Sequence, residues 1–218
     1  MNAFKDFLFW ISCPHYTSLQ IEGVRWDCAS KIALGIDEVL EWQNWAERES
    51  TPDQKRIGKF LSSRKLGGKS LLHVGVGNSE FARIFGREAG AVDGITIQNQ
   101  EYKKGQDLGI ANYRVFLLNK FSVEMPIILG TDYDYIIDNN PTSFACCRKH
   151  FYLMMKSYLK LLRPGGVILT DKQGLNWCTP SNDPLWRLSG EEWFAVGQRF
   201  KLKGIRYNDS VFGLKKTG

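Results

Sequence analysis

Residues 70–82 read Ser-Leu-Leu-His-Val-Gly-Val-Gly-Asn-Ser-Glu-Phe-Ala, a short apolar run that ends in two closely spaced glycines and passes at once into a helical pattern. This order predicts a strand, a tight turn and a helix. Gly75 allows the backbone to leave the strand sharply, and Gly77 removes a Cβ where a ligand would press against the main chain. Asn78 or Ser79 can cap the new helix. We therefore expect a ligand here to meet glycine backbone and the positive end of a helix.

Two classes of ligand use a turn of this kind. Dinucleotide-binding folds need Gly-x-Gly-x-x-Gly, and the third glycine would fall at Glu80, whose negative charge opposes a pyrophosphate. The stretch resembles motif I of the class I S-adenosylmethionine-dependent methyltransferases, acid-x-Gly-x-Gly-x-Gly, except that His73 stands at the acidic position and Ser79 at the third glycine. The alternative is an ordinary strand-to-helix turn. The resemblance implies that the cofactor contacts Gly75, Val76, Gly77, Asn78 and Ser79.

After residue 67 the sequence alternates between strand-like and helix-like segments. The expected strands are residues 70–74, 91–97, 114–118, 133–138, 167–171, 200–207 and 210–214. The expected helices cover about 79–88 and 142–162, and a last helix opens at 189. Such alternation predicts an α/β fold with a doubly wound, mostly parallel sheet, into which the tight turn at Asn208-Asp209 places an antiparallel strand.

Residues 161–169 read Leu-Leu-Arg-Pro-Gly-Gly-Val-Ile-Leu and resemble the "LKPGG-strand" segment of the same methyltransferases. That family has a parallel sheet with helices on both faces and a terminal antiparallel hairpin, which is the order expected here. The resemblance therefore implies a seven-stranded Rossmann-like methyltransferase domain over residues 67–218, with S-adenosylmethionine as its cofactor. It covers the chain from about residue 69 onward.

Residues 1–66 are expected to form a helical extension rather than a separate domain. Residues 1–28 are rich in aromatic side chains, which either pack as a cap on the sheet or close as a lid over an acceptor pocket; the two interpretations are compatible. Residues 29–49 have helical periodicity. A second helix begins at Thr51-Pro52, where threonine caps, proline takes the first helical position and Gln54 completes a capping box. We expect this helix to end at Gly67-Gly68.

The end of the second strand carries no acidic residue, although most members of the family use one there to bind both ribose hydroxyls. The segment Gly-Ile-Thr-Ile-Gln-Asn-Gln at 94–100 resembles the cyclopropane-fatty-acid-synthase branch, which reads Gly-Val-Thr-Leu-Ser-x-x-Gln. That resemblance implies a ribose site at Thr96, Ile97 and Gln100, although Gln100 comes one residue earlier than the glutamine of that branch. A hydroxyl and an amide can both donate and accept hydrogen bonds. The alternative is a plain strand end with a polar turn.

The fourth strand ends in Asp138-Asn139-Asn140-Pro141, beside the first strand and facing the methyl group of the donor. Methyltransferases of amino groups have Asp/Asn-Pro-Pro-aromatic here, and only Asp138 matches that pattern. The resemblance implies that Asp138 and Asn139 contact the cofactor, and Asp138 is also a candidate base, as is His15 in the N-terminal extension. The alternative is an Asx turn that starts the next helix.

Composition limits the class of protein. The 218 residues are 43% hydrophobic and 24% charged, as in a soluble globular domain, and we expect a cytoplasmic protein without a membrane span. The five cysteines are odd in number and irregularly spaced, so we expect neither a metal site nor a disulfide. A net charge of +6 includes a basic run at Lys55, Arg56, Lys59, Arg64, Lys65 and Lys69, which is either a nucleic-acid-binding face or a solvated helix.

The sequence thus predicts a methyltransferase that acts on a small molecule. The aromatic N-terminus and a loop with Trp177 and Trp186 suit a flat or apolar acceptor. Two alternatives remain open. One is an RNA or DNA methyltransferase on the same fold, which the basic run favours. The other is a protein of this fold that binds the cofactor or a partner without turnover, which the missing acids at 73 and 96 favour.

Overall fold

The computed structural model of the chain describes residues 44–122, 124–130, 132–143, 148–177 and 187–218. Several predictions lie outside these residues and stay predictions: the lid at 1–28 with His15, most of the helix at 29–49, and Trp186. All five cysteines also lie outside them. Within the described residues, no helix is long and apolar enough to cross a membrane.

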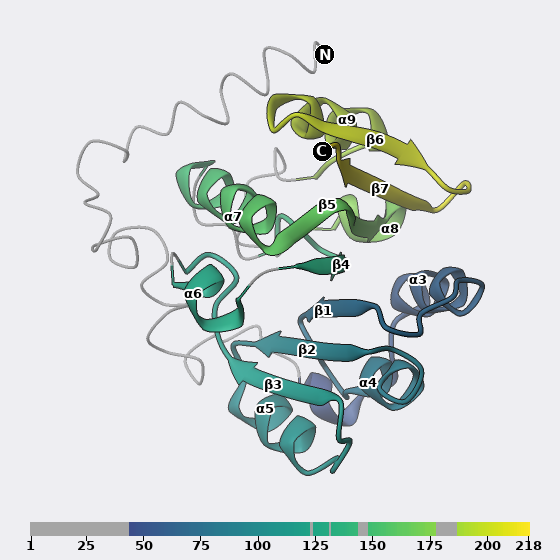
Figure 1. Cartoon of the computed structure of the whole chain (residues 1–218), viewed down its shortest axis with the longest axis vertical. Coiled ribbons are helices and arrows are strands. Elements are labelled where there is room, and N and C mark those ends of the chain that lie inside the picture. Colours follow the sequence, from purple (N-terminus) through teal and green to yellow (C-terminus); the bar gives the residue numbers. More distant parts are fainter. Residues whose placement is uncertain (1–43, 123, 131, 144–147, 178–186) are drawn as a thin grey trace.

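A seven-stranded sheet forms the centre of the molecule (Figure 1). Its strands are β1 (Ser70–Val74), β2 (Ala91–Thr96), β3 (Tyr113–Leu117), β4 (Tyr133–Asp138), β5 (Leu162–Asp171), β6 (Leu202–Arg206) and β7 (Val211–Lys216). They lie in the order β3-β2-β1-β4-β5-β7-β6, and β7 runs antiparallel to both of its neighbours. The expected doubly wound, mostly parallel sheet with one antiparallel strand is therefore confirmed. The order reverses between β1 and β4, which is where such sheets bind ligands.

Helices cover both faces of the sheet, and the alternation of side chains along each strand explains why. Leu71 and Leu72 on β1 point to opposite faces and belong to two separate hydrophobic clusters. One cluster includes residues of α3 (Pro52–Ser62) and α4 (Glu80–Phe85). The other includes residues of α6 (Met125–Leu129), α7 (Arg148–Leu161) and α9 (Gly190–Arg199). The remaining described helices are α5 (Asn99–Gln106), which packs against β2 and β3, α8 (Lys172–Leu175) and the 3-10 turn η3 (Trp45–Glu47).

Local capping starts two of these helices where the sequence predicts. The Thr51 backbone N–H donates to Gln54 Oε1 over 3.2 Å at the start of α3. At the start of α9, the Ser189 backbone N–H donates to Glu192 Oε2 over 2.7 Å, and the Glu192 N–H donates to Ser189 Oγ over 3.2 Å. Each helix therefore has a fixed first residue.

Several boundaries differ from the expectations, most by a few residues and some by more. Helix α3 ends at Ser62, short of the glycine pair at 67–68. Strand β5 begins at Leu162 instead of residue 167, so it includes the Pro-Gly-Gly segment, and its pairing with β4 shifts register between Tyr133 and Tyr135. Helices α5, α6 and α8 lie in stretches where no helix was expected. Of these, α5 contributes directly to the site.

Candidate functional site

A cavity of about 320 Å³ opens at the carboxyl ends of β1 to β4, beside the start of α3. Four loops that follow strands line it, together with the segment that leads into α3. The lining residues are 48–54, 74, 75, 77, 78, 95–97, 118–121 and 138–140, with Trp45, Glu101, Ser143, Gln173 and Trp177. The cavity therefore lies at the switch point of the strand order, and it brings together the predicted positions of three separate loops.

The glycine turn after β1 opens onto this cavity. Gly75 has φ +77° and Gly77 has φ +52°, backbone conformations that favour glycine. A Cβ added at Gly75 would have no heavy atom within 4 Å, and one at Gly77 would meet only Trp45 O at 3.8 Å. Both glycines thus leave open space where a ligand can approach the main chain.

The other predicted residues of this turn have different places. Asn78 lines the cavity, and its Oδ1 accepts from the Glu80 N–H, the first of α4, over 2.9 Å, while Ser79 occupies the N-cap position. The side chain of Ser79 is fully buried, and the residue has φ +61°. The side chain of Val76 is buried against Gly94. Ser79 and Val76 are not among the cavity-lining residues, so their predicted contacts with a cofactor remain predictions that only the backbone could fulfil.

His73, which occupies the acidic position of motif I, is a core residue. It is buried on β1, and its ring stacks on Phe81 with centroids 4.5 Å apart. Burial lowers the pKa of His73 to about 4, so the imidazole is neutral at physiological pH. Its side chain does not line the cavity.

At the end of β2 a carboxylate is present that the sequence prediction missed. Glu101, in the first turn of α5, is 3% exposed, and its Oε2 accepts hydrogen bonds from Thr96 Oγ1 over 2.6 Å and from the Gly77 N–H over 3.2 Å. One carboxylate thus joins the glycine turn to the end of β2. Burial raises the pKa of Glu101, while its two hydrogen bonds act against that rise.

Of the three residues predicted to bind the ribose, two line the cavity and one does not. Thr96 and Ile97 line the cavity, whereas Gln100 is exposed and does not. The signal that could have found Glu101 is the register of the resemblance. In the pattern Thr-Leu-Ser-x-x-Gln, the glutamine comes five residues after the threonine, and five residues after Thr96 is Glu101.

At the end of β4 the carboxylate of Asp138 is engaged within the protein. Lys120 Nζ donates to Asp138 Oδ1 and Oδ2 over 3.2 and 3.1 Å, and Tyr158 OH donates to Oδ2 over 2.7 Å. Lys120 Nζ also donates to Asn140 O over 2.6 Å. Burial lowers the pKa of Lys120, and the charge of Asp138 opposes this effect. The arrangement fixes the loop after β4, and the role of Asp138 as a base stays a prediction.

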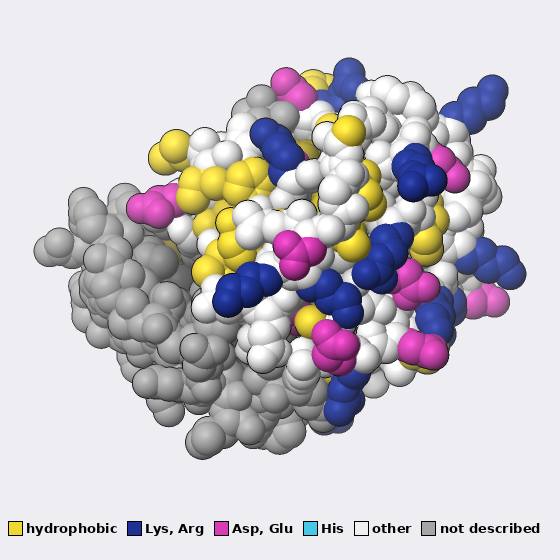
Figure 2. Space-filling model, turned by 90° about the horizontal axis from the view of Figure 1, so that it is seen from below, with side chains coloured by type: hydrophobic (Ala, Val, Ile, Leu, Met, Phe, Trp, Pro, Cys, Tyr) yellow, Lys and Arg dark blue, Asp and Glu magenta, His cyan; other side chains and the backbone are white. Residues whose placement is uncertain are grey.

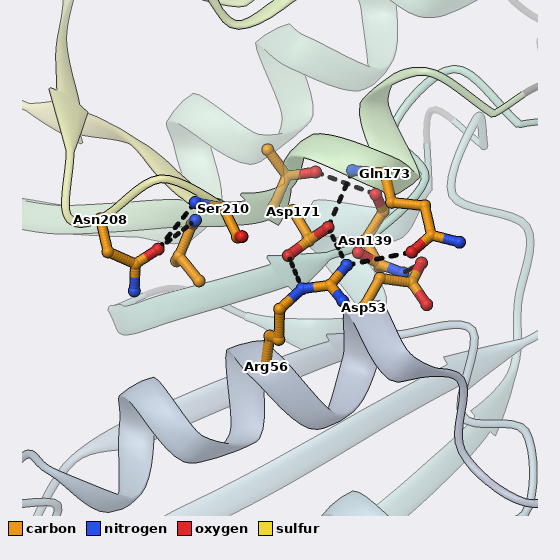
Figure 3. Close-up of polar contacts among 9 residues, drawn as sticks. Asp53, Arg56, Asn139, Asp171, Gln173, Asn208 and Ser210 are labelled. Atoms are coloured by element: carbon orange, nitrogen blue, oxygen red, sulfur yellow. Dashed lines mark hydrogen bonds and ion pairs between the residues drawn. The ribbon is translucent and has the colours of Figure 1, made fainter.

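Helix α3 is docked on the ends of β4 and β5 by two polar contacts (Figure 3). Asn139 Nδ2 donates to Asp53 Oδ2. Arg56 binds the fully buried Asp171 with two hydrogen bonds of 2.9 and 2.7 Å, and it donates a third to Gln173 Oε1 over 3.1 Å. The extension that the sequence separates from the domain therefore supplies one wall of the cavity.

Comparisons with known proteins were made at the level of sequence and of structure. No protein-family model matches the sequence, and no curated protein matches it. Solved structures do share its fold. The N-methyltransferase NodS from Bradyrhizobium japonicum, in complex with S-adenosyl-L-homocysteine, aligns with a TM-score of 0.59 at 10% identity over 86% of this chain and 100% of that one.

Two further structures agree. A sugar N-methyltransferase from a Streptoalloteichus species aligns with a TM-score of 0.58 at 12% identity, over 78% of this chain and 89% of that one. An rRNA methylase from Streptococcus thermophilus aligns with a TM-score of 0.50 at 14% identity, over 78% of this chain and 100% of that one. The chain has the class I methyltransferase fold.

Within this methyltransferase fold, most buried carboxylates form ion pairs, but two of those that line the cavity do not. Buried carboxylates among the described residues are Asp53, Asp93, Glu101, Asp134, Asp138 and Asp171. Four of them form ion pairs: Asp93 with Arg114, Asp134 with Lys69 and Arg163, Asp138 with Lys120, and Asp171 with Arg56. Asp53 and Glu101 have no cationic partner among the described residues, and both line the cavity. The cavity therefore contains two acidic groups that form no ion pair with a described residue, although the charge of Arg56 acts on Asp53.

Proposed function

We propose that this chain is a methyltransferase that binds S-adenosylmethionine in the cavity and transfers its methyl group to a small-molecule acceptor. The observation that carries the proposal is the Glu101 carboxylate, which joins the Gly77 N–H to the Thr96 hydroxyl at the floor of the cavity. It provides an acidic group at the ends of β1 and β2 without the strand-end acid that the sequence lacks. The two N-methyltransferases of the same fold, one of them in complex with S-adenosyl-L-homocysteine, support this reading.

The residues present fit this cofactor. Gly75 and Gly77 leave the main chain accessible beside the cavity, as a ligand that contacts backbone requires. Glu101 has one oxygen, Oε2, occupied by Thr96 and Gly77, and its Oε1 accepts no hydrogen bond from the described residues. A carboxylate oxygen placed in this way suits a ribose hydroxyl, because charge-assisted hydrogen bonds are stronger than neutral ones. Thr96 then acts by orienting Glu101.

S-adenosylmethionine supplies a methyl group on a positively charged sulfur, which is a good leaving group. The protein is therefore required mainly to position the acceptor and to exclude water. Trp177, which is 40% exposed, and the apolar side chains of Leu118 and Phe121 line the cavity and suit an aromatic or apolar acceptor. The two carboxylates without an ion pair attract positive charge and suit a cationic cofactor, although Arg48 and Lys120 also line the cavity.

The nucleic-acid alternative loses much of its basis in the placement of the basic run. Arg56 is bound to Asp171, Lys69 to Asp134, and Lys55 to Glu49. The Arg64 guanidinium lies over Phe60, 4.5 Å from the ring centroid. Figure 2 shows Lys and Arg side chains interspersed with Asp and Glu on the face that it displays. We therefore favour a small molecule as the acceptor.

Titration calorimetry tests the proposal directly. We expect the wild-type protein to bind S-adenosylhomocysteine and not NAD. Gly77→Val should abolish binding, because it places a branched side chain beside the cavity at φ +52°, and circular dichroism should report an intact fold. Methyl transfer from labelled S-adenosylmethionine to a panel of aromatic compounds then separates an enzyme from a binding protein. Binding of NAD with no response to S-adenosylhomocysteine would overturn the proposal.

A further inference from the structure

We propose that Asp53 is the cation-binding group of the cavity and that it binds an ammonium group. This inference deepens the proposed function, because it concerns the same cavity, and it adds a residue from α3 that no sequence motif indicated. The ligand chemistry is a primary or secondary ammonium. Two molecules could present one: the cofactor, through its amino-acid end, or an amine acceptor.

Asp53 is a buried carboxylate at the start of α3. The residue is 7% exposed and lines the cavity at the first turn of α3. An ionised carboxylate that is removed from water is costly unless a partner compensates its charge. Four of the other five buried carboxylates among the described residues follow this rule, since each pairs with Arg or Lys. Asp53 has no such pair, so a positive group from a ligand would complete it.

The cation one helical turn from Asp53 is already paired with another carboxylate. Arg56 lies one turn further along α3 and contributes favourable charge, but its guanidinium donates two hydrogen bonds to Asp171 and one to Gln173. Figure 3 shows Arg56 directed toward Asp171, with Asp53 turned toward Asn139. The ion pair of Arg56 therefore leaves the carboxylate of Asp53 for another partner.

The orientation of Asp53 is fixed by a neutral neighbour. Its Oδ2 accepts from Asn139 Nδ2, and Oδ1 accepts no hydrogen bond from the described residues. Asn139 follows β4 and is itself 5% exposed, so it holds the carboxylate rigidly without neutralising it. The cavity thus offers a preorganised, charged acceptor beside the loop that follows β4. An ammonium group, with two or three donors and a positive charge, is complementary to it.

The test uses Asp53→Asn, which keeps the shape and can still accept from Asn139. Calorimetry measures the binding of S-adenosylhomocysteine and of 5′-methylthioadenosine, which lacks the amino-acid end. A second titration uses benzylammonium, with benzyl alcohol as its uncharged counterpart, in the presence and absence of S-adenosylhomocysteine. The matched control is Asp209→Asn, the same substitution at an exposed turn position between β6 and β7. Thermal unfolding of each variant reports that the fold is retained.

Either of two results supports the proposal and identifies the source. If the cofactor supplies the ammonium, Asp53→Asn weakens the binding of S-adenosylhomocysteine about tenfold or more. The affinity for 5′-methylthioadenosine then stays within about twofold of the wild-type value. If the acceptor supplies it, S-adenosylhomocysteine is unchanged, and benzylammonium binds the wild type but binds the variant about tenfold more weakly, while benzyl alcohol binds neither. Asp209→Asn should change nothing.

Two results overturn it. If Asp53→Asn weakens the binding of neither S-adenosylhomocysteine nor benzylammonium, Asp53 binds no ammonium group. If the variant weakens S-adenosylhomocysteine and 5′-methylthioadenosine equally, Asp53 acts only on the shape of the cavity. The proposed function fails in a different way, when the wild-type protein does not bind S-adenosylhomocysteine at all; the benzylammonium titration without that ligand still tests Asp53.

Discussion

The hydroxyl of Thr96 donates to Glu101 Oε2 over 2.6 Å, and the same oxygen accepts from the N–H of Gly77. Two elements that follow different strands are therefore held by one side chain from α5. Because Thr96 also accepts from the Gln98 N–H over 3.0 Å, its hydroxyl has both of its roles filled by the protein. We therefore expect a ribose bound here to form its hydrogen bonds with Glu101 in preference to Thr96.

Glu101→Gln should weaken S-adenosylhomocysteine more than Thr96→Val does. A hydrogen bond to a charged group contributes about 1.5–3 kcal/mol, which corresponds to roughly ten- to a hundredfold in affinity. Thr96→Val removes a neutral group that orients Glu101, so we expect a loss of about three- to tenfold. Titration calorimetry on both variants decides between them. Equal, negligible losses would mean that the ribose is bound elsewhere.

The affinity for S-adenosylhomocysteine should depend on pH through Glu101. Its burial raises the pKa of the carboxyl, so protonation begins at a higher pH than for an exposed glutamate. Only the ionised form accepts without donating, so affinity is fully present above the raised pKa and is lost as the pH falls through it. Titrations from about pH 8 to about pH 4.5 measure this dependence. Glu101→Gln should flatten the profile over that range, and an unchanged profile would assign the titration to another group.

Asp138→Asn should destabilise the protein, because it leaves the buried Lys120 without its ion pair. Removal of one partner of a buried pair costs about 3–5 kcal/mol, and the ammonium of Lys120 can lower this by losing its proton, so we expect about 3 kcal/mol. Urea unfolding measures the change. The control is Glu191→Gln, which removes an exposed pair with Arg206 and should cost less than about 0.5 kcal/mol. A stable Asp138→Asn protein that has lost only turnover would instead point to a base.

Arg56→Met and Lys55→Met test whether Arg56 docks α3 through a specific ion pair or only adds positive charge to the helix. Arg56 is 38% exposed and pairs with the fully buried Asp171, so its loss should destabilise the protein by about 2 kcal/mol, less than for a wholly buried pair. Lys55 pairs with Glu49 at the surface, where the two side chains are 52% and 91% exposed, and its loss should cost about 0.5 kcal/mol or less. Urea unfolding of the two variants compares them. Equal effects would argue against a specific docking role for Arg56.

A helix or strand of this fold can be predicted from the sequence when its buried positions are apolar and follow the period of that element. Strands β1 and β4 occur at their predicted residues, because each is a short segment with an apolar centre and mostly buried side chains. Helix α5 could not be found in this way. The positions that it buries are Glu101 and Gly105, a charge and a residue without a side chain, so no hydrophobic period marks it. Helix α6 is only five residues long, and its Ile127 is 84% exposed.

The site follows the same division. Gly75, Gly77 and Thr96 were predicted from local patterns, and the structure brings them to one cavity. Glu101 and Lys120 were missed because their roles depend on contacts across the fold: Glu101 reaches back 24 residues to Gly77, and Lys120 pairs with Asp138, 18 residues later. A charged residue in a polar stretch has no feature in the sequence that separates burial from exposure.

The contact between Arg56 and Asp171 spans 115 residues. During synthesis, α3 leaves the ribosome long before β5 does, so it can pack on β1, β2 and α4 before the carboxylate of Asp171 emerges. The ion pair that fixes the Asp53 wall of the cavity to β5 can therefore form only after residue 171 has been made. A nascent or prematurely terminated chain that stops before residue 171 lacks this contact. Because a ligand stabilises only the molecules that bind it, we expect it to stabilise completed chains more than chains that lack the Arg56–Asp171 contact.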